Sequence, residues 1–235
     1  MNFMNLPIEY RKEDSFFQIL PIEYEGAVTY GKGASKGASE IIKASQHLEY
    51  YDEQFDIEPF ENGIHTLNPL NLKDKEPEEA IKIISEESEK HKKKFLISLG
   101  GDHSITIGIV KGLEKENDFD VIILDAHTDF FHSWNNSQYN HRCTAQRIIK
   151  NHKVLEIGIR SMDIDEKELI DSNENINTIK AYDYDKEMLK QELKKLKNNI
   201  YISIDVDVFD PSFIRNTGTP EPGGFFWNDI INILK

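Results

Sequence analysis

The chain has 235 residues, 38% of them hydrophobic, so it is long enough to bury one sizeable core. It carries 28 basic and 42 acidic residues, and the resulting net charge of −14 argues against a general affinity for nucleic acids or anionic membranes. Because it has no signal-peptide pattern and no run near the roughly 18 apolar residues of a membrane span, we expect a cytoplasmic protein. Its single cysteine, Cys143, excludes an internal disulfide and a thiolate-rich zinc cluster.

Strands and helices are predicted to alternate along the whole chain. In the first half we expect strands over residues 16–22 and 95–99, a short strand near 55–60, and helices over 37–48 and 105–113. The charged stretch 73–94 predicts a solvent-facing helix with a narrow apolar face, and His91 within it is expected to be a surface histidine. In the second half we expect strands over 120–124, 153–160 and 177–181, a β-rich run over 200–211, and helices over 166–170, 185–197 and 225–235.

This alternation, with strands that are apolar on consecutive residues, is typical of a parallel sheet covered by helices on both faces. We therefore predict a three-layer α/β/α fold with a central, mainly parallel sheet in one domain over residues 1–235. The last stretch, FFWNDIINILK, predicts an amphipathic helix at which the sequence stops. We accordingly expect a C-terminal part of this domain to be missing from the sequence.

Three of the predicted strands end in aspartate and histidine: KFLISLGGDHSIT (94–106), VIILDAHTD (121–129) and IYISIDVDVFDP (200–211). The carboxyl ends of parallel strands face one common crevice, so these side chains can converge there. Four carboxylates and two imidazoles carry more negative charge than one divalent ion neutralises, and such a set without thiolates suits a pair of Mn²⁺ or similar hard ions. Paired metals of this kind make good hydrolytic centres. The candidate ligands are His103, Asp125, His127, Asp129, Asp205 and Asp207.

The motifs GGDHS (100–104), DAHTD (125–129) and SIDVDVFDP (203–211) resemble those of the ureohydrolases, the arginase and agmatinase family. GKGASKGASEIIKASQHLEYYD, NHRC (140–143) and TGTPEPGG (217–224) also resemble family segments, so the resemblance covers nearly all of residues 25–235. It implies an arginase-like fold and two Mn²⁺ per subunit. It also implies that Asp125 and Asp205 bridge the two ions, that His103 and Asp129 complete one site, and that His127 and Asp207 complete the other.

The resemblance makes His141 and the ligand Asp129 the catalytic residues. His141, in the position of the family's loop histidine, would move a proton to or from the departing amine, a task that suits its near-neutral pKa. The activated water would attack the guanidinium carbon and release urea. Cys143 lies two residues from His141, but we expect it to be a small buried side chain and no nucleophile.

TGTPEPGG resembles agmatinases more than arginases, so the expected reaction is the hydrolysis of agmatine, a small cationic guanidino compound, to putrescine and urea, as in polyamine biosynthesis. Trp134 and Glu221 are candidate contacts for the methylene chain and the cationic tail, although either could serve packing or turn structure instead. Asp163 is a further candidate substrate contact, and Arg160 is assigned a role around the site.

Two alternatives remain open at the level of sequence. One is hydrolysis of another guanidino compound, such as guanidinobutyrate, arginine or formimidoylglutamate. The other is a truncated homologue without catalytic activity that acts within a mixed oligomer. By the resemblance we expect a homo-oligomer, a trimer or a hexamer, with no nucleic-acid or membrane partner.

Overall fold

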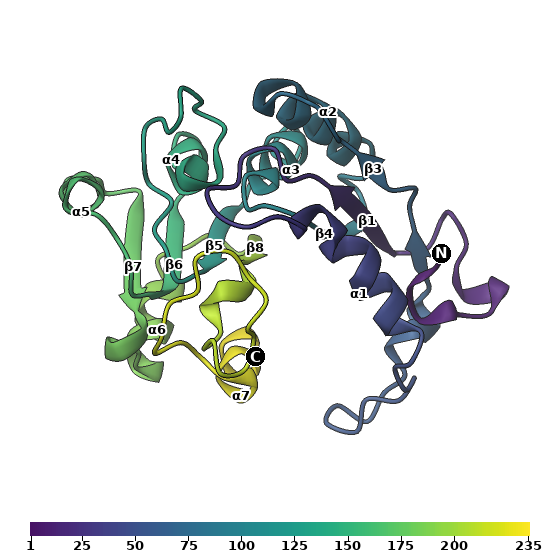
Figure 1. Ribbon diagram of the computed structural model, residues 1–235. Coiled ribbons are helices and arrows are strands. Elements are labelled where there is room, and N and C mark those ends of the chain that lie inside the picture. Colours follow the sequence, from purple (N-terminus) through teal and green to yellow (C-terminus); the bar gives the residue numbers. More distant parts are fainter. The chain divides into compact units, whose positions relative to one another are not determined.

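The computed structural model describes residues 1–235, which form two compact units. The first contains Met1–Gly26 and Lys32–Glu116, and the second contains Ala27–Gly31 and Asn117–Lys235. Each unit holds a parallel sheet and its own helices, and Figure 1 labels the principal elements. None of the helices has the length and apolar composition that a membrane-spanning segment requires.

The first unit is built around strand β1 (Phe17–Glu23), whose five central residues are buried. β1 pairs in parallel with β2 (Ile64–Thr66), β3 (Leu70–Asn71) and β4 (Phe95–Leu99). The helices of this unit are α1 (Gly37–Ser45), α2 (Pro77–Lys90) and α3 (Ile105–Leu113). Its short 3₁₀-helices are η1 (Phe3–Asn5), η2 (Ile8–Tyr10), η3 (Ala34–Lys36) and η4 (Pro59–Asn62).

Helices α2 and α3 pack closely because α3 offers glycines at the contact. A Cβ atom added at Gly108 would lie 2.8 Å from the Ile84 side chain, and one at Gly112 would lie 2.5 Å from the Ser85 carbonyl oxygen. Only one face of α2 is buried, as its mixed-charge sequence predicts. The α2 face comprises Ala80, Ile81, Ile84 and Ser88.

The expectation that His91 is a surface histidine is wrong. Its side chain is only 16% exposed, and its Nδ1 lies 2.5 Å from the Gln18 side-chain oxygen, so Nδ1 donates to that oxygen. Nε2 lies 3.3 Å from the Glu87 carboxylate. The charge pattern around His91 could not reveal a partner on β1, 73 residues earlier in the chain.

The second unit contains a four-stranded sheet in the order β7-β6-β5-β8, with all neighbours parallel. The strands are β5 (Asp120–Leu124), β6 (Val154–Ile159), β7 (Ile176–Lys180) and β8 (Ile200–Ile204). Every residue of β5 and β6 is buried, which explains why both strands are apolar on almost every residue. The helices are α4 (Thr144–Ile148), α5 (Ile164–Asp171), α6 (Lys186–Leu193) and α7 (Trp227–Leu234), with 3₁₀-helices η5 (His141–Cys143), η6 (Ala181–Asp183) and η7 (Val206–Val208).

One hydrophobic core of the second unit joins the sheet to its last two helices. Leu124 and Ile157 of the sheet are fully buried there and pack with Leu189 of α6 and Ile230 of α7. Val208 and Phe225 belong to the same cluster, so the turn after β8 is anchored in the core.

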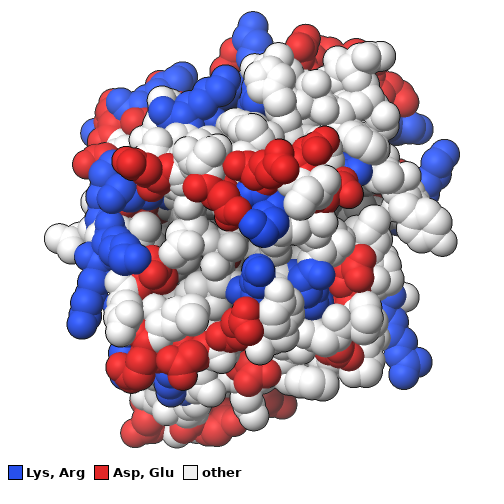
Figure 2. Space-filling model, turned by 90° about the vertical axis from the view of Figure 1, so that its left-hand side faces the viewer, with Lys and Arg blue, Asp and Glu red and all other residues white.

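Acidic and basic side chains are interspersed on the face of the molecule shown in Figure 2.

The parallel α/β architecture is confirmed, and most predicted elements lie within a few residues of their expected positions. The short strand expected near 55–60 is absent. That segment instead holds an isolated antiparallel bridge between Asp52 and Ile57 and the 3₁₀-helix η4. Helix α4, directly after the predicted loop histidine, was not anticipated, because its five residues are too few for a periodic pattern.

Candidate active site

The two neighbouring strands β5 and β8 end together at the candidate site. The Asp125 N–H donates to the Ile157 carbonyl at 3.1 Å, and the Asp205 N–H donates to the Leu124 carbonyl at 2.9 Å. Both main chains therefore keep the sheet's hydrogen-bonding pattern for one residue beyond their strands. This places Asp125 and Asp205 at the same carboxyl edge, as expected for ligand-bearing residues of a parallel sheet.

Asp125, His127 and Asp207 form a compact cluster whose candidate ligand atoms all lie within 4.8 Å of one another. His127 Nδ1 is 3.1 Å from Asp207 Oδ2 and 3.6 Å from Asp125 Oδ1. Main-chain donors fix both carboxylates: the His127 N–H donates to Asp125 Oδ1 at 2.7 Å, and the Ala126 N–H donates to Asp207 Oδ1 at 3.1 Å. Asp205 Oδ1 in turn accepts the Asp207 N–H at 3.1 Å. The cluster is thus held in place before any ligand binds.

The carboxylates of this cluster repel one another in a buried setting. Burial and the charges of Asp125 and Asp205 raise the pKa of Asp207 to about 8, against the opposing effect of His127. Burial alone would lower the pKa of His127, but its hydrogen bonds to Asp125 and Asp207 and their charges raise it to about 11. The metal-free cluster therefore favours protons, and a divalent cation would replace them. Two oxygen donors and one imidazole nitrogen suit Mn²⁺ or a similar ion.

The other two predicted ligands have distinct local settings. Asp129 is buried and has a left-handed backbone with φ of 45°, and its carbonyl accepts the Ala145 N–H at 3.2 Å. His103 belongs to the first unit, so its contribution to a metal site remains a prediction from the sequence. The role of Asp129 as a ligand likewise stays a prediction from the sequence.

The turn that carries His103 is shaped by close main-chain packing. A Cβ atom at Gly101 would lie 1.8 Å from the Tyr24 carbonyl oxygen, so only glycine fits there. Asp102 Oδ1 accepts the Ser104 N–H at 3.0 Å and also bonds the Ser104 hydroxyl. Asp102 and Ser104 therefore stabilise the entry into α3.

His141 is held through both ring nitrogens. It begins η5, and its Nδ1 makes a short hydrogen bond to the Ala27 carbonyl, so Nδ1 carries the hydrogen. Its Nε2 lies 3.0 Å from the Thr29 hydroxyl oxygen. When the ring is neutral, Nε2 consequently carries the lone pair and accepts from Thr29. The ring orientation thus leaves Nε2 as the nitrogen that can take up a proton.

Trp134 and Asp163, both predicted to contact substrate, both contact Arg142. The Arg142 guanidinium lies 4.1 Å from the Trp134 ring centroid and 4.2 Å from the Phe131 ring centroid. Its Nη2 donates to Asp163 Oδ2 at 2.9 Å. Packing against Arg142 accounts for both positions, and a substrate contact by either residue stays a prediction from the sequence.

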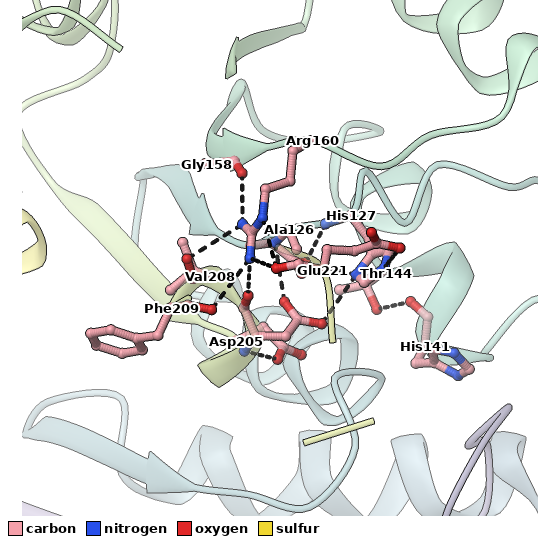
Figure 3. A network of polar contacts seen from close by, with 12 residues as sticks. Ala126, His127, His141, Thr144, Gly158, Arg160, Asp205, Val208, Phe209 and Glu221 are labelled. Atoms are coloured by element: carbon pink, nitrogen blue, oxygen red, sulfur yellow. Dashed lines mark hydrogen bonds and ion pairs between the residues drawn. The ribbon is translucent and has the colours of Figure 1, made fainter. Parts of the chain in front are cut away.

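Arg160 and Glu221 lie close together beside the cluster, as Figure 3 shows. The Arg160 guanidinium donates to the Glu221 main-chain carbonyl through Nη2 at 2.9 Å and through Nε at 3.2 Å. The Glu221 carboxylate lies 4.0 Å from His127 Nε2. Arg160 thus holds the Glu221 main chain beside the cluster.

Two buried or capping carboxylates around the site were missed by sequence reasoning. Glu166 of α5 is buried and accepts the Phe130 N–H at 2.9 Å and the Asp163 N–H at 3.0 Å, so it ties the loop after DAHTD to α5. Asp210 accepts the N–H groups of Gly223 and Gly224 at 2.9 and 3.2 Å. Both had a sequence signal, because Asp210 lies within the third motif and Glu166 follows Asp163 at the spacing of a capping box.

Cys143 is a free, fully buried thiol, as expected. Burial raises its pKa to about 11, so the thiolate that a nucleophilic role requires is disfavoured. This supports a site without a cysteine nucleophile.

Fold and site together define a parallel α/β protein with a carboxylate and imidazole cluster at the carboxyl edge of its sheet, an arrangement suited to a metal-dependent hydrolase. The model of the arginase family matches residues 16–235. The chain therefore belongs to the arginase family, and it is a hydrolase of the ureohydrolase type.

The relatives agree with this assignment. The chain is 31% identical over 229 residues to the N(1)-aminopropylagmatine ureohydrolase of Thermus thermophilus, covering 95% of this chain and 78% of that protein. It is 33% identical over 228 residues to the agmatinase of Pyrococcus horikoshii, covering 95% and 79%. The crystal structure of the agmatine ureohydrolase of Thermoplasma volcanium matches with a TM-score of 0.84 and 27% identity, over 94% of this chain and 77% of that one.

Proposed function

We propose that this protein is a binuclear Mn²⁺ hydrolase that cleaves the guanidinium group of agmatine to give putrescine and urea. The observation that carries the proposal is the cluster of the buried Asp125 and Asp207 with the half-buried His127 at the ends of β5 and β8. Relatives named agmatinase and N(1)-aminopropylagmatine ureohydrolase support a guanidino amine as the substrate. The name of the Thermus thermophilus relative makes N(1)-aminopropylagmatine the second candidate substrate.

The chain supplies donors suited to two ions. In the proposed arrangement Asp125 and Asp205 are shared, His127 and Asp207 complete one site, and His103 and Asp129 complete the other. Bound Mn²⁺ would supply a water of lowered pKa and would polarise the guanidinium group. The buried carboxylates of the chain would hold the ions and offset their charge.

His141 is the proposed proton carrier for the departing amine. Its Nδ1 hydrogen bonds to the Ala27 carbonyl, so protonation and deprotonation take place at Nε2. The Thr29 hydroxyl can donate to the neutral Nε2 and accept from the protonated one, which suits a group that changes its protonation state during turnover.

A urea-release assay tests the substrate. The Mn²⁺-loaded protein would be offered agmatine, N(1)-aminopropylagmatine, guanidinobutyrate, arginine and formimidoylglutamate under identical conditions. We expect the highest kcat/KM with agmatine, and the N(1)-aminopropyl derivative is the next candidate. Release of formamide from formimidoylglutamate in place of urea from agmatine would overturn the agmatinase assignment. Binding of Mn²⁺ without turnover of any compound would favour a non-catalytic homologue.

We further propose that the protein works in the cytoplasm as a homo-oligomer, a trimer or a hexamer. Light scattering coupled to gel filtration would give its molar mass in solution. A mass of 27.2 kDa, that of one chain, would contradict the proposed assembly.

A further inference from the structure

The loop over residues 217–224 is fixed to its surroundings at two points. The Arg160 guanidinium holds the Glu221 carbonyl through two donors, at 2.9 and 3.2 Å. Asp210 Oδ2 holds the N–H groups of Gly223 and Gly224, at 2.9 and 3.2 Å. The main chain is therefore anchored at Glu221 itself and again at Gly223 and Gly224, so Glu221 has little freedom to move.

The same guanidinium also holds the turn that carries Asp207. Arg160 Nη2 donates to the Asp207 carbonyl at 2.7 Å and to the Phe209 carbonyl at 3.3 Å, and Nη1 donates to the Gly158 carbonyl at 3.1 Å. All of these acceptors are main-chain oxygens, as Figure 3 shows. One side chain thus fixes the backbone of Glu221 relative to the backbone of Asp207.

The packing around this guanidinium leaves no spare room. A Cβ atom added at Gly224 would lie 2.6 Å from Arg160 Nη2 and 2.6 Å from the Asp210 nitrogen. The end of the loop can approach the guanidinium this closely only because residue 224 is glycine.

The two ring nitrogens of His127 face different carboxylates. Nδ1 faces Asp125 and Asp207, whereas Nε2 faces the Glu221 carboxylate at 4.0 Å. A neutral imidazole carries one N–H and one lone pair. If Nδ1 gives its lone pair to a cation held by Asp125 and Asp207, the hydrogen must be on Nε2, where Glu221 is the facing acceptor.

We propose that Glu221 is a positioning residue for His127, in place of the substrate-binding role that its sequence context suggests. Its carboxylate accepts the Nε2 hydrogen when Nδ1 binds the metal, which fixes the ring orientation and makes Nδ1 the better donor. Histidine ligands in proteins almost always have such a carboxylate or carbonyl partner on their second nitrogen. The inference rests on the proposed function insofar as it takes His127 to be a metal ligand.

Manganese affinity, measured by electron paramagnetic resonance of free Mn²⁺ during titration, tests the role directly. Glu221→Leu should bind one of the two ions about 10- to 100-fold more weakly, which is the usual effect of removing such a partner from a histidine ligand. Glu221→Gln keeps a side-chain oxygen that accepts the Nε2 hydrogen and should recover most of the affinity. Glu168→Leu and Glu168→Gln, on the exposed surface of α5, are the matched controls and should bind like the unaltered protein.

The outcomes separate this inference from the proposed function. If Glu221→Leu binds both ions like the unaltered protein but shows a raised KM for agmatine, Glu221 contacts substrate and the positioning role is wrong. The proposed function stands even with that result, provided that the unaltered protein binds two Mn²⁺ ions and releases urea from agmatine. If the unaltered protein binds no Mn²⁺ at all, the proposed function fails, and the positioning role fails with it.

A second variant tests the frame that holds Glu221. Arg160→Lys keeps the positive charge but replaces a planar fork of five donors with one ammonium group, which cannot serve the same set of carbonyls. We expect the variant to fold, as judged by circular dichroism, and to lose Mn²⁺ affinity in the same direction as Glu221→Leu. Unchanged Mn²⁺ affinity in folded Arg160→Lys would show that the Arg160 hydrogen bonds are not needed to position Glu221.

Discussion

The buried Asp125 carboxylate takes part in several polar contacts at once. It is 1% exposed, it accepts the His127 N–H through Oδ1, and it lies 3.6 Å from the His127 ring nitrogen. A buried carboxylate in this setting is costly unless a cation or a proton compensates its charge. Its role in the proposed function is therefore the most direct one to test.

Asp125→Asn should abolish binding of both Mn²⁺ ions, because it removes an anionic ligand that the two sites are proposed to share. The measurement is the metal content of the purified protein after Mn²⁺ loading and dialysis. Asp205→Asn should behave in the same way. If Asp125→Asn retained one tightly bound ion, Asp125 would serve a single site, and the shared-ligand arrangement would be wrong.

His141→Ala should retain metal and lose rate, because His141 is proposed to move protons and not to bind the ions. We expect kcat to fall by roughly 10²- to 10⁴-fold, the usual contribution of general acid–base catalysis. Steady-state kinetics and metal analysis of the same sample decide the matter. Loss of Mn²⁺ from this variant would show that His141 is a ligand.

At this scale the sequence indicated which residues matter and not how each is held. Asp125, His127 and Asp207 were selected as candidates because three motifs of this kind each follow an apolar strand. The partners of His141 and Glu221 could not be found, since the Ala27 and Glu221 carbonyls belong to the main chain, which every residue has. Thr29 is 112 residues away from His141, so no local pattern joins them.

The end of strand β6 illustrates how an element sets the site. Gly158 has φ of 103°, and a Cβ atom there would lie 2.7 Å from the Val208 side chain and 2.9 Å from the Asp125 carbonyl oxygen. The strand can therefore approach the two turns that carry the predicted ligands only with glycine at this position.

Gly158→Ala should lower the free energy of unfolding by about 2–4 kcal/mol, the combined order of backbone strain and overpacking. Urea denaturation gives the value. Gly31→Ala is a suitable control, because Gly31 also has a positive φ, 78°, but its added Cβ would meet nothing within 4 Å. A loss for Gly158→Ala no larger than for the control would show that β6 shifts to make room.

Asp210 gives the loop over 217–224 a defined pH dependence. Hydrogen bonds from the Ser212 hydroxyl and N–H, together with the N–H groups of Gly223 and Gly224, lower the pKa of Asp210 to about 2. Since the folded value lies below the unfolded value of roughly 3.9, this stabilisation is complete above pH 4 and is lost as the pH falls toward 2.

The difference in unfolding free energy between the unaltered protein and Asp210→Asn should accordingly shrink as the pH is lowered from 5 to 2. Urea denaturation at several pH values measures it, and the carboxyl carbon resonance of Asp210 should titrate near pH 2. A difference that is constant over this range would mean that the charge of Asp210 contributes nothing to holding the loop.

For the whole molecule, the parallel α/β class followed from apolar runs such as those of β5 and β6, which are buried on every residue. The strand order did not follow from the sequence, because the pairing of β5 with β8 joins residues about 80 positions apart, such as Asp120 and Ile200. Nor did the patterns indicate the two compact units, since no change in composition marks their limits.

Metal binding should stabilise the molecule as well as activate it. At a Mn²⁺ concentration 100-fold above the dissociation constant, one site adds about 2.7 kcal/mol, which for a chain of this size corresponds to a Tm increase of roughly 5–10 °C. Differential scanning calorimetry with Mn²⁺ and after chelation measures the shift. Asp125→Asn should show none, and equal Tm values for the unaltered protein in both states would contradict a folded metal centre.

The short segment Ala27–Gly31 limits how the protein can be dissected. It packs with the second unit, although the residues on either side of it in the chain belong to the first. A fragment beginning at Asn117 would keep Asp125, His127 and Asp207 but would lose the carbonyl and hydroxyl that hold His141. Such a fragment would keep these predicted ligands without an oriented His141 ring, and a synthetic peptide spanning residues 27–31 would carry both of the missing groups.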